Sequence, residues 1–223
     1  MNIGVTYAEL GRMGRFGNQL FQIASTIGLS YRERLPYAFG GWDYDDYFVN
    51  PLPKREPNTF YKSYNGYLQN YQNFEWCQQI LQNQFTLKPR NLEIPENTVF
   101  IHFRAYSKDM LGDVSNIHPE QSTEYYYTAT KLFPNKKFIV FTDNIEIAKK
   151  VLYFLDCPFV SSKNCIDDFY VMSKCEGGII SNSSFSWWAG WLCNGLVVIP
   201  KKWFTEKASY PTEGYYLPEW LSL

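Results

Sequence analysis

The chain has 223 residues, a formal net charge of −1 and an aromatic content of 19%. This length fits one domain or two small ones, and the near-zero charge argues against nucleic acid or an anionic membrane as a partner. No apolar run reaches 18 residues and no charged start precedes one, so we expect neither a transmembrane helix nor a signal peptide.

The five cysteines form no C-x-x-C pair and are odd in number, so we expect reduced thiols in the core of a cytoplasmic protein. His102 and His118 are the two histidines, which argues against a histidine-rich metal site. The many aromatic residues serve either as stacking surfaces for sugars and bases or as large core residues. Composition alone does not decide between these roles.

The N-terminal region predicts a strand over 2–9, a glycine-rich loop and a helix over 18–31, which is the usual opening of an α/β nucleotide-type fold. The glycines allow close approach of a ligand to the backbone. Their spacing matches neither G-x-G-x-x-G nor a phosphate loop that ends in Gly-Lys-Ser/Thr. Asn18 stands where a helix N-cap is expected.

Residues 35–60 are irregular and contain Asp43 and Asp45, a D-x-D pair that offers two carboxylates for Mg²⁺ or Mn²⁺. No clear hydrophobic strand precedes the pair, so a solvated acidic loop is the favoured interpretation. A strand and turn follow over 59–70 and a short helix over 72–85. The proline-containing, charged segment 87–97 predicts a domain boundary, which gives domains 1–88 and 89–223.

From Val99 onward, strands and helices alternate, which predicts a parallel sheet with helices on its faces. The expected strands cover 99–104, 137–142, 158–161, 177–181 and 196–199, and the expected helices cover 122–132, 145–155, 167–174 and 184–193. Ligands of such sheets bind at the carboxyl ends of the strands. The polar residues that fall at such ends are His102, Arg104, Thr142, Asp143 and Ser181.

The stretch 178–192 reads as a short apolar strand, a turn of serines and Asn182, and an apolar helix. Unpaired N–H groups and the positive end of the helix dipole favour an anion at such a start, most often a phosphate. An ordinary capped core helix has the same pattern, and spacing alone leaves both interpretations open.

Six segments occur in the order in which they occur in one enzyme family: GRFGNQLFQ (14–22), HFR (102–104), FTDN (141–144), DDFYVMSKC (167–175), SNSSFSWWAGWL (181–192) and IPKKWF (199–204). By these motifs the chain resembles glycosyltransferase family 11, the α-1,2-fucosyltransferases. The resemblance implies a GT-B-like fold of two Rossmann-like domains, with the N-terminal one reduced here. It also implies metal-independent, inverting transfer of L-fucose from GDP-β-L-fucose to a glycan hydroxyl, such as the 2-hydroxyl of galactose.

The same resemblance implies roles for individual residues. Arg104 would bind the diphosphate together with the serine-rich turn, and Asp168 with His102 would bind guanine, with Asp167 as the alternative carboxylate and helix capping as the other explanation. GRFGNQ also occurs in the protein O-fucosyltransferases, and that resemblance implies that the glycine-rich loop faces the donor and the reacting centre across an interdomain cleft. The implied residues are Arg104, Asn18 and Asp109 for catalysis, and Arg15, Gly17, His102, Asp168, Ser183, Ser184 and Phe185 for donor binding.

The base that takes the acceptor proton stays open among Asp109, Asp113, His118 and Glu124; Asp109 is the acid that follows the arginine motif. The family's pattern here is His-x-Arg-Arg-x-Asp, and Ala105 stands at the second arginine, which puts the choice of donor sugar or acceptor in doubt. Two rival functions are transfer of another GDP-deoxyhexose, such as rhamnose, and a sugar-binding module without catalysis. Animal members carry an N-terminal membrane anchor that is not expected here.

Overall fold

In a computed structural model of the chain, the structure describes residues 2–94, 96–106, 114–193, 195–208 and 210–223. The chain forms two compact units: Met1–Pro89 with Glu213–Tyr215, and Arg90–Thr212 with Tyr216–Leu223. The sequence predicts a boundary after residue 88, and the main division falls between Pro89 and Arg90. No sequence pattern indicates that the segment Glu213–Tyr215 belongs to the first unit.

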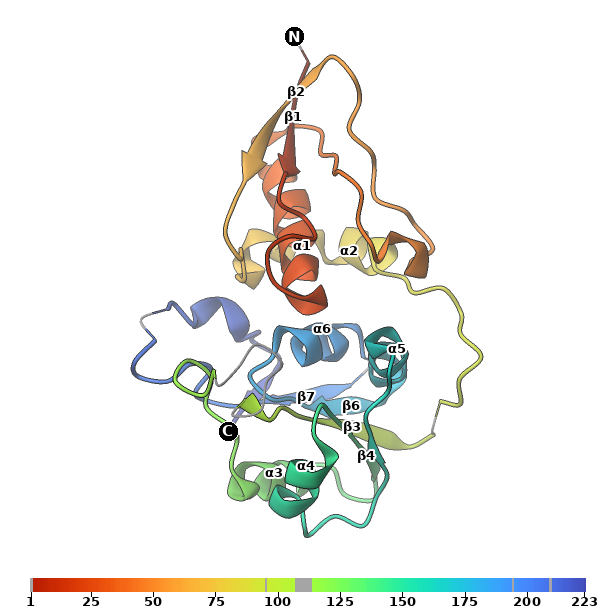
Figure 1. Cartoon of the computed structure of the whole chain (residues 1–223), viewed down its shortest axis with the longest axis vertical. Coiled ribbons are helices and arrows are strands. Elements are labelled where there is room, and N and C mark those ends of the chain that lie inside the picture. Colours follow the sequence, from red (N-terminus) through yellow and green to blue (C-terminus); the bar gives the residue numbers. More distant parts are fainter. Residues whose placement is uncertain (1, 95, 107–113, 194, 209) are drawn as a thin grey trace. The chain divides into compact units, whose positions relative to one another are not determined.

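The first unit is built on two parallel strands, β1 (Asn2–Tyr7) and β2 (Thr59–Tyr64), which pair along their whole length. The helices of this unit are α1 (Phe16–Glu33) and α2 (Gln78–Gln84), as Figure 1 shows. A parallel pair connected through a helix is the minimal α/β arrangement.

Helix α1 begins two residues before its predicted start. The carbonyl of Arg15 already accepts a hydrogen bond from the N–H of Gln19 at 3.1 Å, so Arg15 is the N-cap residue. At the other end, Arg34 adopts a left-handed conformation with φ of 56°, and its N–H bonds back to the last turn. The apolar residues Leu20, Phe21, Ala24 and Ile27 of this helix are buried, whereas Tyr31 near its end is 49% exposed.

Two buried glutamines of α1 hold the glycine-rich loop. The side-chain amide of Gln19 donates to the carbonyl of Gly14, and that of Gln22 donates to the carbonyl of Met13, both at 3.0 Å. A loop without secondary structure needs such partners for its backbone groups when it is not solvated. The loop that precedes α1 therefore has a defined shape.

The region after Asn70 does not form the single helix predicted over 72–85. Two 3-10 turns, Tyr71–Asn73 and Glu75–Cys77, precede α2. The side chain of Asn70 accepts from the N–H of Gln72 at 2.9 Å. Such local side-chain bonds to the backbone compete with a continuous helix.

Many aromatic residues lie in the core. In the first unit Trp42 stacks on Phe48 with ring centroids 5.3 Å apart, and Phe16 packs against both. In the second unit Trp187 and Trp188 are fully buried. Packing accounts for these rings, although Tyr153 and Phe60 remain largely exposed.

The second unit contains a six-stranded sheet in the order β5-β4-β3-β6-β7-β8, and every neighbouring pair is parallel. The strands are β3 (Thr98–Phe103), β4 (Lys137–Thr142), β5 (Phe159–Val160), β6 (Gly177–Ile179), β7 (Leu196–Ile199) and β8 (Leu221–Ser222). The helices are α3 (Thr123–Thr130), α4 (Ile145–Val151), α5 (Cys165–Lys174) and α6 (Ser184–Leu192).

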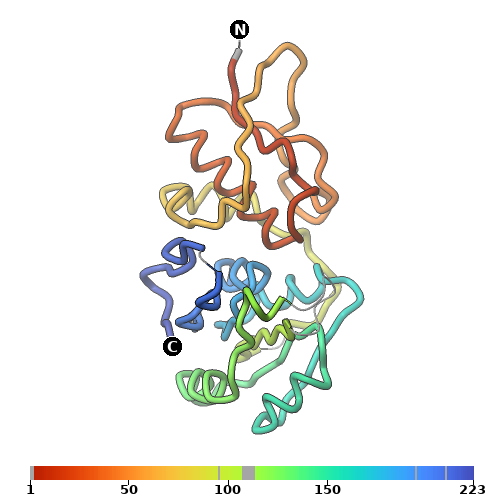
Figure 2. The backbone as a smooth tube through the Cα atoms, turned by 60° about the vertical axis from the view of Figure 1, so that its left-hand side comes forward, coloured from red at the N-terminus to blue at the C-terminus, as the bar shows by residue number. Residues whose placement is uncertain are grey.

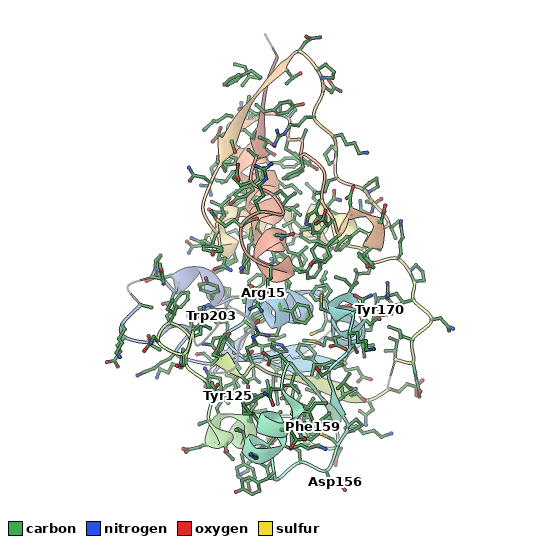
Figure 3. All side chains as sticks on the ribbon, viewed as in Figure 1. Arg15, Tyr125, Asp156, Phe159, Tyr170 and Trp203 are labelled. Atoms are coloured by element: carbon green, nitrogen blue, oxygen red, sulfur yellow. The ribbon has the colours of Figure 1, made fainter. Side chains whose placement is uncertain are left out.

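Figure 1 shows α5 and α6 on one face of this sheet and α3 and α4 on the other. The face toward α3 and α4 carries a hydrophobic cluster centred on Ile101, Phe103 and Tyr126. Tyr125, labelled in Figure 3, reaches from α3 to the sheet, and its hydroxyl lies 2.7 Å from the carbonyl oxygen of Ile180. The helices thus bury the sheet on both sides, as expected for parallel strands.

The C-terminal strand β8 is absent from the sequence prediction. Leu221 pairs with Val198 of β7, and the N–H of Leu223 donates to the carbonyl of Ile199 at 3.1 Å. Figure 2 shows the course of the backbone, with this last segment in blue. Two residues are too few to show a hydrophobic period, so only the pairing itself identifies the strand.

The predicted α/β class is confirmed in each unit. Each holds a parallel sheet with helices, and the N-terminal sheet is reduced to two strands. The predicted strands and helices of the second unit all exist, and their ends shift by a few residues. Such shifts are usual where capping bonds decide the last turn.

No helix in the described ranges is both long and apolar enough to cross a membrane. All five cysteines are thiols rather than disulfides. Burial raises the pKa of Cys175 and Cys193 to about 12 each, so both stay protonated at neutral pH. Cys165 departs from the expectation of core thiols, because it is exposed at the start of α5.

Candidate functional site

Three neighbouring strands of the second unit deliver polar residues to one edge of the sheet. The register pairs Phe103 of β3 with Thr142 of β4, so Arg104 and Asp143 follow side by side. Strand β6 lies on the other side of β3 and leads into the turn at Ser181. This is the carboxyl edge, where parallel α/β sheets bind their ligands.

Arg104 forms an ion pair with Asp143. Its Nη1 atom lies 2.8 Å from one carboxylate oxygen of Asp143, and the other oxygen accepts from the N–H of Ala105 at 3.1 Å. The side chains of Arg104 and Asp143 are 13% and 26% exposed. A partly buried, charge-assisted pair of this kind is oriented by both contacts and is less screened than a surface pair.

Tyr106 connects the Arg104 segment to the turn after β6. Its ring lies 6.0 Å from the guanidinium carbon of Arg104, and its hydroxyl donates to the carbonyl of Asn182 at 2.6 Å. The amide of Asn182 donates in turn to the carbonyl of Trp203, which Figure 3 labels, at 2.8 Å. Asn182 is 1% exposed, so this turn is anchored through buried bonds.

Helix α6 starts at the serine cluster, as the sequence predicts. Ser183 is the N-cap residue by backbone position, yet its side chain makes no capping hydrogen bond, and Ser184 is the first helical residue. Ser186 faces inward and donates to the carbonyl of Ser183 at 3.2 Å. The ordinary explanation of Ser183 as a side-chain cap is therefore not what the structure shows.

A histidine and two phenylalanines lie beside this helix start. Nδ1 of His102 is 2.8 Å from the hydroxyl oxygen of Ser181, and His102 as a residue is 6% exposed. The ring of Phe185 lies between His102 and Phe169, with centroid distances of 5.7 and 5.4 Å. The predicted donor-binding residues His102 and Phe185 are thus in contact.

The two carboxylates at the start of α5 have different partners. Asp168 accepts from the N–H of Ser162 at 3.2 Å and from its hydroxyl at 2.5 Å, whereas Asp167 pairs with Arg90, whose Nε lies at 2.6 Å. Burial raises the pKa of Asp168 above its usual value, and the Ser162 bonds oppose that shift. Asn164 caps the helix instead, so neither aspartate is the N-cap.

Of the four candidate bases, Asp109 and Asp113 lie outside the described residues. Glu124 is exposed in the first turn of α3. His118 stacks on Tyr106 with centroids 4.9 Å apart and also packs against Phe204. Because Tyr106 lies next to Arg104, His118 is the candidate that the described structure brings near the arginine.

The predicted residues Arg15, Gly17 and Asn18 belong to the first unit, where they stand at the start of α1; Figure 3 labels Arg15. Asn18 lies inside the helix, so the expectation that it is the N-cap is wrong. Its side-chain oxygen accepts from the amide of Gln69 at 2.6 Å, and Gln69 accepts from the hydroxyl of Tyr215 at 2.6 Å.

Gly14 has φ of +73°, and a Cβ atom there would lie 2.3 Å from the amide nitrogen of Asn18. A glycine is therefore required for the loop to pass this side chain.

One member of the acidic pair in the first unit, Asp45, has a structural role. A carboxylate oxygen of Asp45 accepts from the N–H of Leu52 at 2.9 Å, and Asp43 is exposed. Within the part of the chain that the structure describes, no group of three or more His, Cys, Asp or Glu side chains has the geometry to hold a metal ion.

Three contributors to this edge received no role from the sequence: Asp143, Tyr106 and Asn182. Asp143 was visible in the sequence only as a polar residue directly after a predicted strand. The hydroxyl of Tyr106 bonds to the backbone carbonyl of Asn182 from a distant segment, and no local sequence pattern predicts such a contact.

The sequence profile described as Glycosyl transferase family 11 matches residues 43–223, which is well over half of the chain. The chain belongs to glycosyltransferase family 11. The match includes the segments that carry Arg104, Asp143, Asp168 and the serine cluster, whereas Arg15, Gly17 and Asn18 precede it.

Two relatives from Escherichia coli are similar to this family 11 chain. An alpha-1,2-colitosyltransferase is 31% identical over 162 residues, which are 64% of this chain and 56% of that protein. The O-antigen biosynthesis glycosyltransferase WbnK is 31% identical over 121 residues, which are 48% of this chain and 39% of that protein. The chain therefore spans about half the length, or less, of these curated relatives.

Among solved structures, the crystal structure of NodZ alpha-1,6-fucosyltransferase soaked with GDP-fucose aligns with 86% of this chain and 91% of its own, at 12% identity and a TM-score of 0.48.

In this family 11 chain the departure at Ala105 has a structural correlate. Ala105 is fully buried in the hydrophobic cluster behind β3, and its N–H is bonded to Asp143. A second arginine at this position would need a different path for the chain, because a guanidinium is not buried in apolar surroundings.

Proposed function

We propose that this family 11 glycosyltransferase transfers L-fucose from GDP-β-L-fucose to a glycan hydroxyl, with inversion, and that the 2-hydroxyl of a galactose is the acceptor group. One observation carries the proposal: Arg104 and the serine-rich start of α6 follow adjacent strands at the carboxyl edge of the second unit. This arrangement suits a diphosphate, which needs a guanidinium and N–H donors. The names of the two Escherichia coli relatives describe the same class of reaction, the transfer of a sugar.

The chemistry follows from this placement. As the bond between the anomeric carbon and the β-phosphate oxygen breaks, negative charge grows on the diphosphate. Arg104 and the N–H groups of α6 stabilise that charge without reorganising, which is the largest contribution that such a site makes to catalysis. The acceptor hydroxyl attacks from the opposite side of the sugar ring and loses its proton to a base, for which Asp109 and His118 stay candidates.

His102, with Phe185 beside it, and the half-buried Asp168 are proposed to bind guanine. An ionised carboxylate accepts from both the N1–H and the amino group of guanine, and Asp168 is held in place by Ser162. Arg15, Gly17 and Asn18 are proposed to contribute from the first unit. A cytoplasmic location is part of the proposal, and the five thiols support it.

A second donor is favoured by one of the relatives, which is named as a colitosyltransferase. Colitose is L-fucose without its 3-hydroxyl group. A site that bonds this hydroxyl rejects the deoxy sugar by about 10⁴-fold, whereas a site without a partner for it tolerates both sugars. The choice between fucose and colitose as donor sugar therefore depends on whether the site bonds the 3-hydroxyl group.

The test is a donor panel of GDP-linked L-fucose, colitose and D-rhamnose, with a terminal galactoside as acceptor and product linkage determined by NMR. We expect GDP-fucose to give the highest kcat/KM and an α-1,2-linked product. A preference for GDP-colitose would move the assignment to the second donor. Binding of galactosides without turnover of any of the three donors would contradict the enzyme assignment and favour a sugar-binding module.

We further expect transfer without a divalent cation, because Arg104 and α6 supply the positive charge that a metal would otherwise supply. Activity is measured in excess EDTA and after addition of Mn²⁺. Full activity in EDTA is the expected result. Loss of activity that Mn²⁺ restores would oppose this proposal, and Asp43→Asn would then test whether the acidic pair holds the metal.

A further inference from the structure

We infer that Asp143 is a positioning residue that orients Arg104 for the departing diphosphate. The inference rests on the proposed function, since it concerns the same site. A carboxylate next to a diphosphate site repels the ligand, so its presence there calls for a compensating role. The geometry around Asp143 supplies that role.

The position of Asp143 is fixed by its own turn. The N–H of Asn144 donates to the hydroxyl oxygen of Thr142 at 3.0 Å, and the side chain of Asn144 caps α4 by accepting from the N–H of Ile147 at 3.1 Å. Asp143 stands between these two bonded residues. Its backbone is thus held by the end of β4 and the start of α4.

The carboxylate uses both oxygens on the neighbouring strand end. One contacts Nη1 of Arg104 at 2.8 Å, and the other accepts from the N–H of Ala105 at 3.1 Å. The Asp143 carboxylate therefore holds both the side chain of Arg104 and the backbone of the next residue. A guanidinium is planar, so a contact at one nitrogen restricts the directions in which its other donors point.

The substitution of Asp143 has two opposing effects, which separate its role in orienting Arg104 from the effect of its negative charge on GDP binding. Removing the negative charge strengthens the attraction of the site for GDP in the ground state. Losing the orientation of Arg104 weakens the stabilisation of charge that appears only in the transition state. We therefore expect Asp143→Asn to leave the Kd of GDP within about threefold or to lower it, while kcat falls by about 10- to 100-fold, as for misplaced catalytic groups.

The experiment measures kcat, KM and the Kd of GDP for Asp143→Asn, Arg104→Ala and the double variant. If Asp143 acts through Arg104, Asp143→Asn has no further effect on kcat in the Arg104→Ala background. Glu146→Gln removes an exposed carboxylate in the first turn of α4 and is expected to behave as the unaltered protein. Asp143→Asn is nearly isosteric, and its melting temperature reports whether the fold is intact.

A kcat within threefold of the unaltered enzyme for Asp143→Asn overturns the inference. The inference is also overturned if Asp143→Asn lowers kcat by the same factor in the Arg104→Ala background as in the unaltered enzyme. That result is expected of a residue that is merely structural. If Arg104→Ala itself changes neither kcat nor GDP binding, the proposed diphosphate site is wrong. That result is distinguishable from a failure of the positioning role alone, in which Arg104→Ala is impaired and Asp143→Asn is not.

Discussion

Arg104→Ala is expected to lower kcat by about 10²- to 10³-fold, as removal of other preorganised charge stabilisers does. Arg104 lies at the end of β3, 13% exposed and held by Asp143, so its guanidinium meets the diphosphate without first leaving bulk water. Since the charge on the diphosphate grows as the bond breaks, the loss appears in kcat as well as in KM. Steady-state kinetics with GDP-fucose and a galactoside acceptor measure both.

Two companion variants sharpen this expectation. Arg104→Lys recovers only part of kcat, because an ammonium group cannot make the planar, two-pronged contact. Ser184→Ala costs less than either, since one hydroxyl is lost while the N–H groups of α6 remain. Each variant is checked for a melting temperature within a few degrees of the unaltered protein. Near-normal turnover of a folded Arg104→Ala enzyme would contradict the assignment of the diphosphate site to this edge of the sheet.

Asp168→Asn is expected to remove the preference for GDP over UDP by roughly tenfold to a hundredfold, corresponding to about 1–3 kcal/mol for a partly buried hydrogen-bond partner. The amide offers one acceptor where the carboxylate offers two, and the guanine N1–H and amino group need both. Calorimetric titration with GDP and UDP gives the ratio. Asp167→Asn is the matched control, because that carboxylate is paired with Arg90, and its loss should affect both nucleotides equally.

The same residue predicts a pH dependence of nucleotide selectivity. Burial raises the pKa of Asp168, so its ionised, guanine-accepting form is lost at a higher pH than for an ordinary carboxyl as the solution is acidified. GDP selectivity is therefore full above the folded-state pKa and declines as the pH falls through it. The ratio of GDP to UDP affinity cancels the titration of the diphosphate itself. A ratio independent of pH in the unaltered protein, or unchanged in Asp168→Asn, would contradict the guanine role.

The contribution of Asp168 to folding stability has the opposite pH dependence to its contribution to GDP selectivity. A raised pKa means that burial disfavours the ionised form of Asp168 in the folded state. Its contribution to stability is therefore greatest below the unfolded-state pKa and is lost as the pH rises through the folded-state pKa. Asp168→Asn removes the cost of burying the charge and keeps one acceptor for Ser162. We expect the melting temperature of Asp168→Asn at neutral pH to lie at most a few degrees below that of the unaltered protein.

The sequence by itself determined the α/β class, the parallel sheet of the second unit and the helix that starts at Ser184. These features depend on local periods, on the position of apolar runs and on residues such as Asn144 and Ser122 that cap helices through their own side chains. It also placed Arg104, Asp143 and Ser181 at strand ends, because the carboxyl edge of a parallel strand follows directly from its boundaries.

Tertiary structure alone decided which of these residues meet. The register of β3 on β4 makes Asp143 a partner of Arg104, and a one-residue slip would separate them. Tyr106 reaches Asn182 across 76 positions of sequence, and Asn18 depends on Gln69 and Tyr215 from two distant segments. Such contacts depend on distances between parts of the folded chain, and no local pattern of residue types encodes them.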